Sequence, residues 1–169
     1  MPDLAAVNRM DQDAFVALLG GVFEHAAWVA WAAWHERPFA SVADLHAAMM
    51  RAVRAVPAPT RRAFLGGHPE LAGPESRARS LTADSASEQG SAGLDRISEA
   101  DAAAFDRLNA AYRARFGFPF IIAVRGRSRA EILKVFAARL ERDPADEEAT
   151  ALDEVAQITR MRLDRLIQS

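Results

Sequence analysis

The stretch SEADAAAFDRLNAAYRARFG, residues 98–117, decides the fold class of this chain. Ser98 followed three residues later by Asp101 is typical of a helix start, because the serine hydroxyl can accept a hydrogen bond from the first free amide groups. Apolar residues then recur at helical spacing: Phe105, Leu108, Tyr112 and Phe116. Gly117 is a typical helix stop. The stretch therefore predicts one amphipathic helix with a buried face.

Similar signals recur along the 169 residues. They predict helices that begin near Asp11, Ser41, Ser85, Ser128 and Asp146. A short helix over 61–65 should end at the sequence GGHP of residues 66–69, with a glycine in the left-handed conformation, and residues 73–84 should form a polar loop. Only residues 118–124 look extended, and one such run cannot form a sheet by itself. We expect an all-α fold in which residues 1–169 form a single-domain helical bundle with no β-sheet.

The run AAWVAWAAW, residues 26–34, is apolar on every side. A helix of this kind is buried in a core or against another subunit, and it has more apolar surface than one small core can cover. We expect a homodimer that buries part of this helix or its neighbours.

The composition excludes several classes of function. A net charge of −2 gives no field that would draw the chain to nucleic acid or to an anionic membrane, so Arg125, Arg127 and Arg129 should form a solvated loop. The sequence has no cysteine, and its one lysine, Lys134, fits a solvated helix position, which excludes thiolate and most Schiff-base chemistry. No apolar stretch is long enough to cross a bilayer, and neither end carries a targeting signal. We expect a cytoplasmic protein.

Motifs for metals and cofactors are missing as well. The sequence has no glycine-rich phosphate loop and no dinucleotide fingerprint. His25, His35 and His46 are ten and eleven residues apart, which does not place them on one helix face. His35 and His46 should therefore lie at the surface, and we expect no bound metal and no cofactor.

His68 is the histidine whose setting suggests chemistry. It stands between Gly67 and Pro69, in a segment that must be non-helical. A histidine presented in this way can act as a general acid or base near neutral pH. The alternative is a loop histidine bonded to a backbone carbonyl, and both interpretations stay open on this context.

Glu88 and Arg162 each allow two interpretations. Glu88 completes a capping box with Ser85, and on sequence chemistry alone that structural role is favoured over a place in a polar pocket wall. On a helix over 146–167, Arg162 projects between Val155 and Ile158, inside the apolar arc. An interior guanidinium needs an anionic partner, which could be an internal carboxylate or a substrate carboxylate.

Three motifs together resemble one family. The sequence HPELAG spans 68–73, LTAxSxSEQ spans 81–89 and LNxxYxxxFGFPFI spans 108–121. In this order and spacing they resemble the OHCU decarboxylases, which act on 2-oxo-4-hydroxy-4-carboxy-5-ureidoimidazoline in the ureide pathway of purine breakdown. The resemblance extends from Leu18 to Leu163, nearly the whole chain.

The resemblance implies an all-α homodimer that decarboxylates this substrate to (S)-allantoin and CO2 without a cofactor. The general acid/base histidine of the family falls on His68. Its substrate-contacting positions fall on Pro69, Ser85, Ala86, Ser87, Glu88 and Gln89, on the backbone of Phe118, Pro119, Phe120, Ile121 and Ile122, and on Arg162. We expect His68, Glu88 and Arg162 to converge on one pocket that the backbone of 118–122 floors.

Two other functions compete with this expectation. The first is a catalytically silent helical scaffold or dimerisation module, in which His68, Glu88 and Arg162 would be far apart. The second is a hydrolase that acts on a neighbouring ureide, which would need a metal or an activated water.

Overall fold

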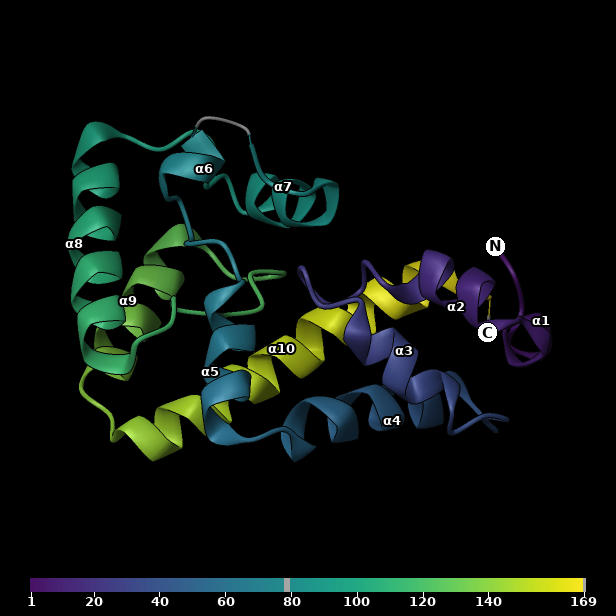
Figure 1. Cartoon of the computed structure of the whole chain (residues 1–169). Helices are drawn as coiled ribbons and strands as arrows, with labels where there is room; N and C mark the ends of the chain where they lie inside the picture. Colours follow the sequence, from purple (N-terminus) through teal and green to yellow (C-terminus); the bar gives the residue numbers. More distant parts are fainter. Residues whose placement is uncertain (78–79, 169) are drawn as a thin grey trace. The chain divides into compact units, whose positions relative to one another are not determined.

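The computed structural model describes residues 1–77 and 80–168, and α-helices make up its regular structure (Figure 1). The helices are α1 Leu4–Arg9, α2 Gln12–Leu19, α3 Trp28–Trp34, α4 Val42–Ala55, α5 Ala58–Gly66, α6 Pro74–Arg77, α7 Ala83–Ser91, α8 Glu99–Phe116, α9 Arg129–Leu140 and α10 Pro144–Leu166. Within these residues there is no β-sheet, and an isolated bridge joins Asp3 to Gln168. The all-α prediction is confirmed. Among the described helices, none has the length and apolar character needed to cross a membrane.

The contacts of the chain divide it into two compact units. The first comprises residues 1–67 together with the described residues from 156 onward, and the second comprises residues 68–155. Helix α10 contributes its first part to the second unit and its last part to the first. The expectation of a single domain over 1–169 stays a prediction.

In the first unit, α3 packs against α2 and α4. The side chains of Asp11 and Ser41 accept hydrogen bonds from the amides of Ala14 and Asp44, so two of the predicted helix starts are confirmed. The core of this unit consists of apolar side chains from these helices, among them Phe15, Leu19, Val29, Leu45 and Met49. The two ends of the chain meet, because the Gln168 amide donates to the Pro2 carbonyl at 2.9 Å.

Helix α3 buries one face rather than its whole circumference. Val29, Ala30 and Ala33 are buried, whereas Trp28 is 36% and Trp31 is 53% exposed. The seven residues of α3 contact α2 and α4 along one side. Burial of these two indoles in the core is therefore the wrong alternative, and their burial against another subunit stays a prediction.

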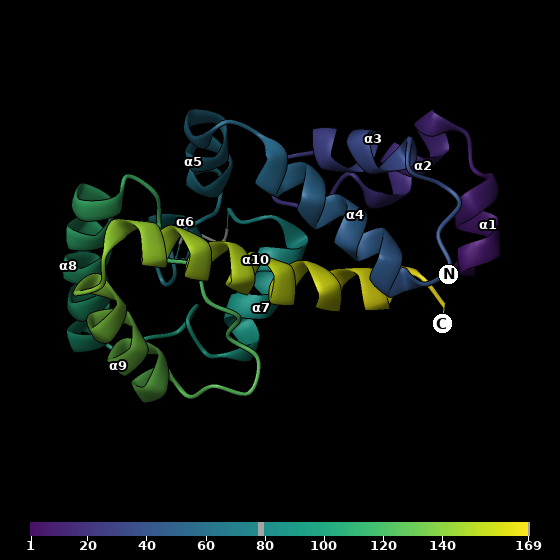
Figure 2. The same cartoon turned by 90° about the horizontal axis from the view of Figure 1, so that it is seen from below.

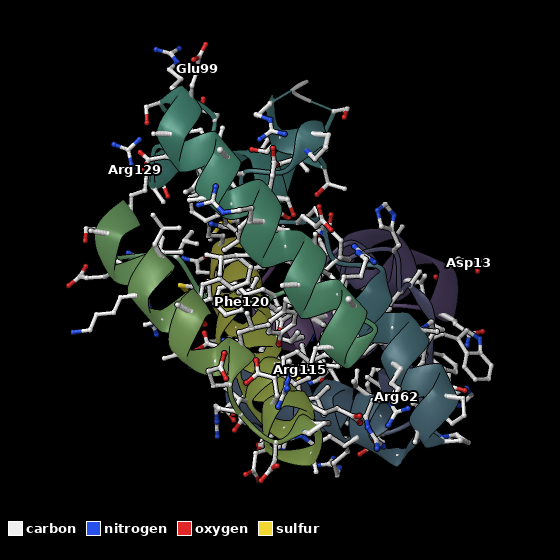
Figure 3. The ribbon with its side chains drawn as sticks, turned by 90° about the vertical axis from the view of Figure 1, so that its left-hand side faces the viewer. Asp13, Arg62, Glu99, Arg115, Phe120 and Arg129 are labelled. Atoms are coloured by element: carbon white, nitrogen blue, oxygen red, sulfur yellow. The ribbon has the colours of Figure 1, made fainter. Side chains whose placement is uncertain are left out.

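The second unit is built around α8 and α9, which lie side by side (Figures 1 and 2). The helix predicted from residues 98–117 runs over Glu99–Phe116, with Ser98 as N-cap and Gly117 in the left-handed conformation at φ 78°. Its buried aromatic side chains meet those of α9 and of the extended segment 118–124: Phe105, Tyr112, Phe116, Phe118, Phe120 and Phe136. Figure 3 labels Phe120, whose ring lies 3.9 Å from that of Phe136 on α9 and 5.5 Å from that of Tyr112 on α8, centroid to centroid.

Two local predictions in the middle of the chain are wrong. Residues 73–84 are not one loop, because Pro74–Arg77 form the short helix α6, with proline at the position where its missing amide costs nothing. Gly67 is not left-handed, since its backbone is right-handed helical at φ −75°. Pro69 disfavours helical backbone at the residue before it, so α5 ends here without a left-handed glycine.

Candidate active site

His68 begins the second unit, directly after α5, and its side chain is buried at 7% exposure. It opens the loop of residues 68–73, which we call the His68 loop. Pro69, the next residue, is half-buried. Ala72 has a φ of 50°, a backbone conformation that a residue with a Cβ rarely adopts. The loop therefore needs outside contacts to hold its shape.

Two side chains from neighbouring helices provide such contacts. The carboxamide of Gln89 on α7 accepts a hydrogen bond from the Ala72 amide at 2.9 Å and donates one to the Glu70 carbonyl at 3.1 Å. The Nδ2 group of Asn109 on α8 donates to the Leu71 carbonyl at 3.0 Å. Hydrogen bonds from α7 and α8 thus hold backbone groups of three consecutive residues in the His68 loop: Glu70, Leu71 and Ala72.

Helix α7 begins one turn earlier than predicted. Thr82 is its N-cap, and the Ser85 amide donates to the Thr82 hydroxyl at 3.4 Å, so the predicted capping box of Ser85 and Glu88 is wrong. Ser85 and Gln89 are buried, Glu88 is half-buried, and the two residues between Ser85 and Glu88 are exposed. Because Glu88 precedes Gln89 on the same helix, the residue next to Glu88 holds the His68 loop.

The two residues between Ser85 and Glu88 are Ala86 and Ser87, which the resemblance places among the substrate contacts. Both are exposed in this structure. Their contact with substrate stays a prediction.

The extended segment 118–122 is buried along its whole length: Phe118, Pro119, Phe120, Ile121 and Ile122. It pairs with no strand among residues 1–77 and 80–168. Instead, the Ile121 carbonyl accepts a hydrogen bond from Arg139 Nη1 at 2.8 Å, and the amide of Ala123 donates to the Glu154 carboxylate at 2.8 Å. Side chains of α9 and α10 therefore satisfy backbone groups that a partner strand would otherwise satisfy.

Arg139 belongs to a buried polar cluster that sequence reasoning missed. Its guanidinium lies over the Phe120 ring at 4.5 Å and pairs with Glu147, which also accepts a hydrogen bond from the Tyr112 hydroxyl. Burial, and secondarily the hydrogen bond to Glu147, raises the pKa of Tyr112 well above its ordinary value. The cluster joins α8, α9 and α10 beneath the extended segment.

Arg162 lies in the first unit and is buried, so the prediction that it faces the interior is confirmed. Its Nη1 group lies 2.9 Å from Glu24 Oε2 and 3.3 Å from the Val22 carbonyl, and the side chains of Arg162 and Glu24 are each 2% exposed. An internal carboxylate is thus one partner of Arg162, and a substrate contact stays a prediction. The expected convergence of Arg162 with His68 and Glu88 also stays a prediction.

Glu24 has a second neighbour in the same unit. A Cβ placed on Gly67, the residue before His68, would lie 3.8 Å from the Glu24 carbonyl oxygen, which is ordinary contact distance. Glu24 therefore pairs with Arg162 through its carboxylate, and its backbone lies beside Gly67.

The remaining histidines differ in environment. His35 is exposed, as predicted, with its ring near those of Trp31 and Trp34. His46 is only partly exposed, because it is half-buried and its Nε2 lies 2.9 Å from the Thr159 hydroxyl. Burial lowers the pKa of His46. Over residues 1–77 and 80–168, no three His, Asp or Glu side chains are grouped so that they could hold a metal ion.

Comparison with known proteins adds a family to this geometry. The family model of OHCU decarboxylase matches residues 8–164. A 2-oxo-4-hydroxy-4-carboxy-5-ureidoimidazoline decarboxylase of Amia calva is 40% identical over 98% of this chain and 95% of its own length, and one of Mus musculus is 39% identical over 98% and 93%.

A solved structure agrees with the sequence matches. The crystal structure of (S)-allantoin synthase is 28% identical and superposes with a TM-score of 0.79. The match covers 100% of this chain and 55% of that one. Since the family model covers nearly all of the sequence and the relatives match it almost end to end, the chain belongs to the OHCU decarboxylase family.

Proposed function

We propose that this chain catalyses the decarboxylation of 2-oxo-4-hydroxy-4-carboxy-5-ureidoimidazoline to (S)-allantoin and CO2 in purine degradation. One observation carries the proposal: the family match extends over residues 8–164 and includes His68, Glu88 and Arg162. All three are at least partly buried. The chain is accordingly a carboxy-lyase, and the silent scaffold is the disfavoured alternative.

The substrate contains its own electron sink. When the bond between the ring carbon and the carboxylate breaks, the electron pair forms a C=C bond to the ureido-bearing carbon. The electrons of the ring C=N bond then move to nitrogen, which takes a proton. The resulting enol loses its hydroxyl proton while the ureido-bearing carbon gains one, and the face of that protonation sets the hand of allantoin. The protein has to orient the substrate and move protons, so we propose that no cofactor is required.

We assign the groups as follows. The His68 imidazole carries the proton to or from the reacting carbon, while the Glu88 carboxylate accepts hydrogen bonds from ring or ureido N–H groups. Arg162 pairs with the anionic part of the substrate. Two observations support this assignment. The helix of Glu88 holds the His68 loop through Gln89, and Arg162 is a buried cation that already pairs with one carboxylate, that of Glu24.

The decisive experiment mixes freshly made substrate with the protein and follows the circular dichroism of (S)-allantoin together with the release of CO2. Turnover with both signals supports the proposal. Consumption of the ureide without CO2 would instead support the hydrolase alternative. Addition of EDTA should leave the rate unchanged, and restoration of a chelated, inactive enzyme by zinc or manganese would refute the mechanism without a cofactor.

We also propose that the protein is a cytoplasmic homodimer. The exposed indoles of Trp28 and Trp31 on α3 supply apolar surface that a second copy could cover. Sedimentation at low micromolar concentration should show a dimer, and a monomer under these conditions would contradict this part of the proposal.

A further inference from the structure

The His68 loop is held by a side chain that the fold does not favour at its position. Asn109 lies in the interior of α8, between Glu99 and Phe116, and is 4% exposed. Asparagine is a poor helix former, because its side chain competes for backbone hydrogen bonds. An apolar residue would serve the helix and the surrounding core better.

The hydrogen bonding of Asn109 is also incomplete within the fold. Its Nδ2 group donates to the Leu71 carbonyl, whereas its Oδ1 atom is buried and has no hydrogen-bond partner among the described residues. Burial of an unpaired acceptor is unfavourable. The hydrogen bond to the Leu71 carbonyl is therefore the one favourable interaction in the described part of the chain that a polar side chain at position 109 provides.

The bonded carbonyl lies at a critical place in the loop. Leu71 stands between Glu70 and Ala72, whose backbone groups bind the carboxamide of Gln89. His68 lies three residues earlier, and Pro69, with its fixed φ, restricts the chain between them. A shift of the Leu71 carbonyl is therefore passed to the His68 backbone with little freedom to absorb it.

We infer that Asn109 is a positioning residue for His68: its hydrogen bond to the Leu71 carbonyl fixes the His68 loop against α8, while Gln89 fixes the loop against the helix that carries Glu88. This inference rests on the proposed function, in which His68 transfers the proton. Asn109 acts through the loop and does not touch the substrate.

The test is Asn109→Leu, which removes the hydrogen bond and the unpaired oxygen together and keeps a similar volume. Stability should change little, since an apolar group replaces an under-bonded polar one. We expect kcat to fall by about tenfold to a hundredfold, because small misplacements of reacting groups have effects of that size, while KM changes by less than about threefold. A kcat within about threefold of the parent protein would overturn the inference.

Asn8→Leu is the matched control. Asn8 likewise binds loop backbone, donating to the Phe39 carbonyl and accepting from the Phe39 amide, both at 2.9 Å, in the first unit. This variant should reduce the melting temperature and leave kcat unchanged. If Asn109→Leu is too unstable to assay, Asn109→Ala and Asn109→Asp replace it with the same criterion. A loss of activity in Asn109→Leu that disappears once the rate is divided by the folded fraction would also overturn the inference.

A second readout does not depend on turnover. Amide exchange of the peptide that contains residues 68–73 should quicken by about tenfold in Asn109→Leu, because the loop loses one of its anchors, and exchange near Phe39 should not change. Unchanged exchange at 68–73 would overturn the inference even in an active enzyme. If the parent protein lacks turnover but the exchange rate rises, the proposed function fails while the role of Asn109 in holding the loop stands.

Discussion

The buried pair of Arg162 and Glu24 makes the sharpest prediction about stability and function together. Both side chains are 2% exposed, and their charged atoms lie 2.9 Å apart. Water cannot screen either charge if the other is removed. Loss of one member of a buried pair costs about 3–5 kcal/mol, because the other charge stays buried without the opposite charge. For a chain of this size, each kcal/mol lowers the melting temperature by roughly 2–4 °C.

We therefore expect Arg162→Met and Glu24→Gln each to lower the melting temperature by roughly 6–20 °C. Thermal and urea unfolding, followed by far-ultraviolet circular dichroism, measure this change. The control lies on the same helix: Arg160 and Asp164 are paired at 2.9 Å but are 41% and 45% exposed. Arg160→Met should cost less than about 0.5 kcal/mol.

A double variant separates the structural role of Arg162 from its proposed role in substrate binding. Arg162→Met combined with Glu24→Leu removes both charges and fills the space with apolar groups, which should recover most of the lost stability. Turnover should stay at least about a hundredfold below that of the parent protein if Arg162 also pairs with the substrate.

Two results would refute this reasoning. Single variants within about 1 kcal/mol of the parent protein would show that the pair is not desolvated as its burial indicates. A stable double variant with normal kinetics would show that Arg162 is a structural residue only, and the assignment of the substrate anion to it would then be withdrawn.

Three further predictions concern pH and backbone. Burial and Glu147 raise the pKa of Tyr112 above its ordinary 10.0, so the unfolded chain loses the phenol proton at a lower pH than the folded chain does. Stability should therefore fall as the pH rises above 10.0, and Tyr112→Phe should remove this dependence in urea titrations. Burial lowers the pKa of His46 below its ordinary 6.5, so the unfolded chain gains the proton at a higher pH than the folded chain does. Stability should therefore fall as the pH drops below 6.5, and His46→Gln should reduce this loss of stability. Gly117→Ala should lower the free energy of unfolding by about 1–2 kcal/mol in the same titrations, because φ is 78° at this position. At both Gly117 and Gly21 no atom lies within 4 Å of an added Cβ, but Gly21 has no positive φ, so Gly21→Ala should lower it less.

Helix starts could be predicted where a single capping residue precedes the apolar pattern. Ser98 and Ser128 fulfil this condition, and the box of Ser128 with Glu131 is present as expected. At α7 the condition fails, because Thr82 and Ser85 are both capping residues and stand one turn apart. Serine is slightly preferred over threonine as an N-cap, but the structure uses Thr82. The prediction of a helix in the second motif is confirmed, whereas the capping box of Ser85 and Glu88 is wrong.

Burial of a charged side chain could be predicted, whereas its partner could not. The helical angle of Arg162 relative to Val155 and Ile158 is a local property and indicated the interior position. Glu24 lies 138 positions earlier in the chain, and no local pattern connects the two. For the same reason the role of Asn109 could not be predicted, although Asn109 belongs to the third motif, since its contact to Leu71 spans 38 positions. An asparagine on the buried face of a predicted helix is the signal that could have found it.

Two buried arginine–glutamate pairs are found in the described part of the chain, Arg162 with Glu24 and Arg139 with Glu147. Stability alone does not explain them, because apolar replacements of such pairs are often equally stable. Such a pair provides a charged group whose direction is fixed by packing. A charge that is already oriented can stabilise the transition state without any rearrangement of the protein during the reaction. Arg139 donates to the Ile121 carbonyl, within the segment that the resemblance assigns to the substrate pocket. A decarboxylase that takes its electron sink from the substrate has to supply oriented groups from its own side chains, and a charged group held in this way by a buried partner meets that requirement.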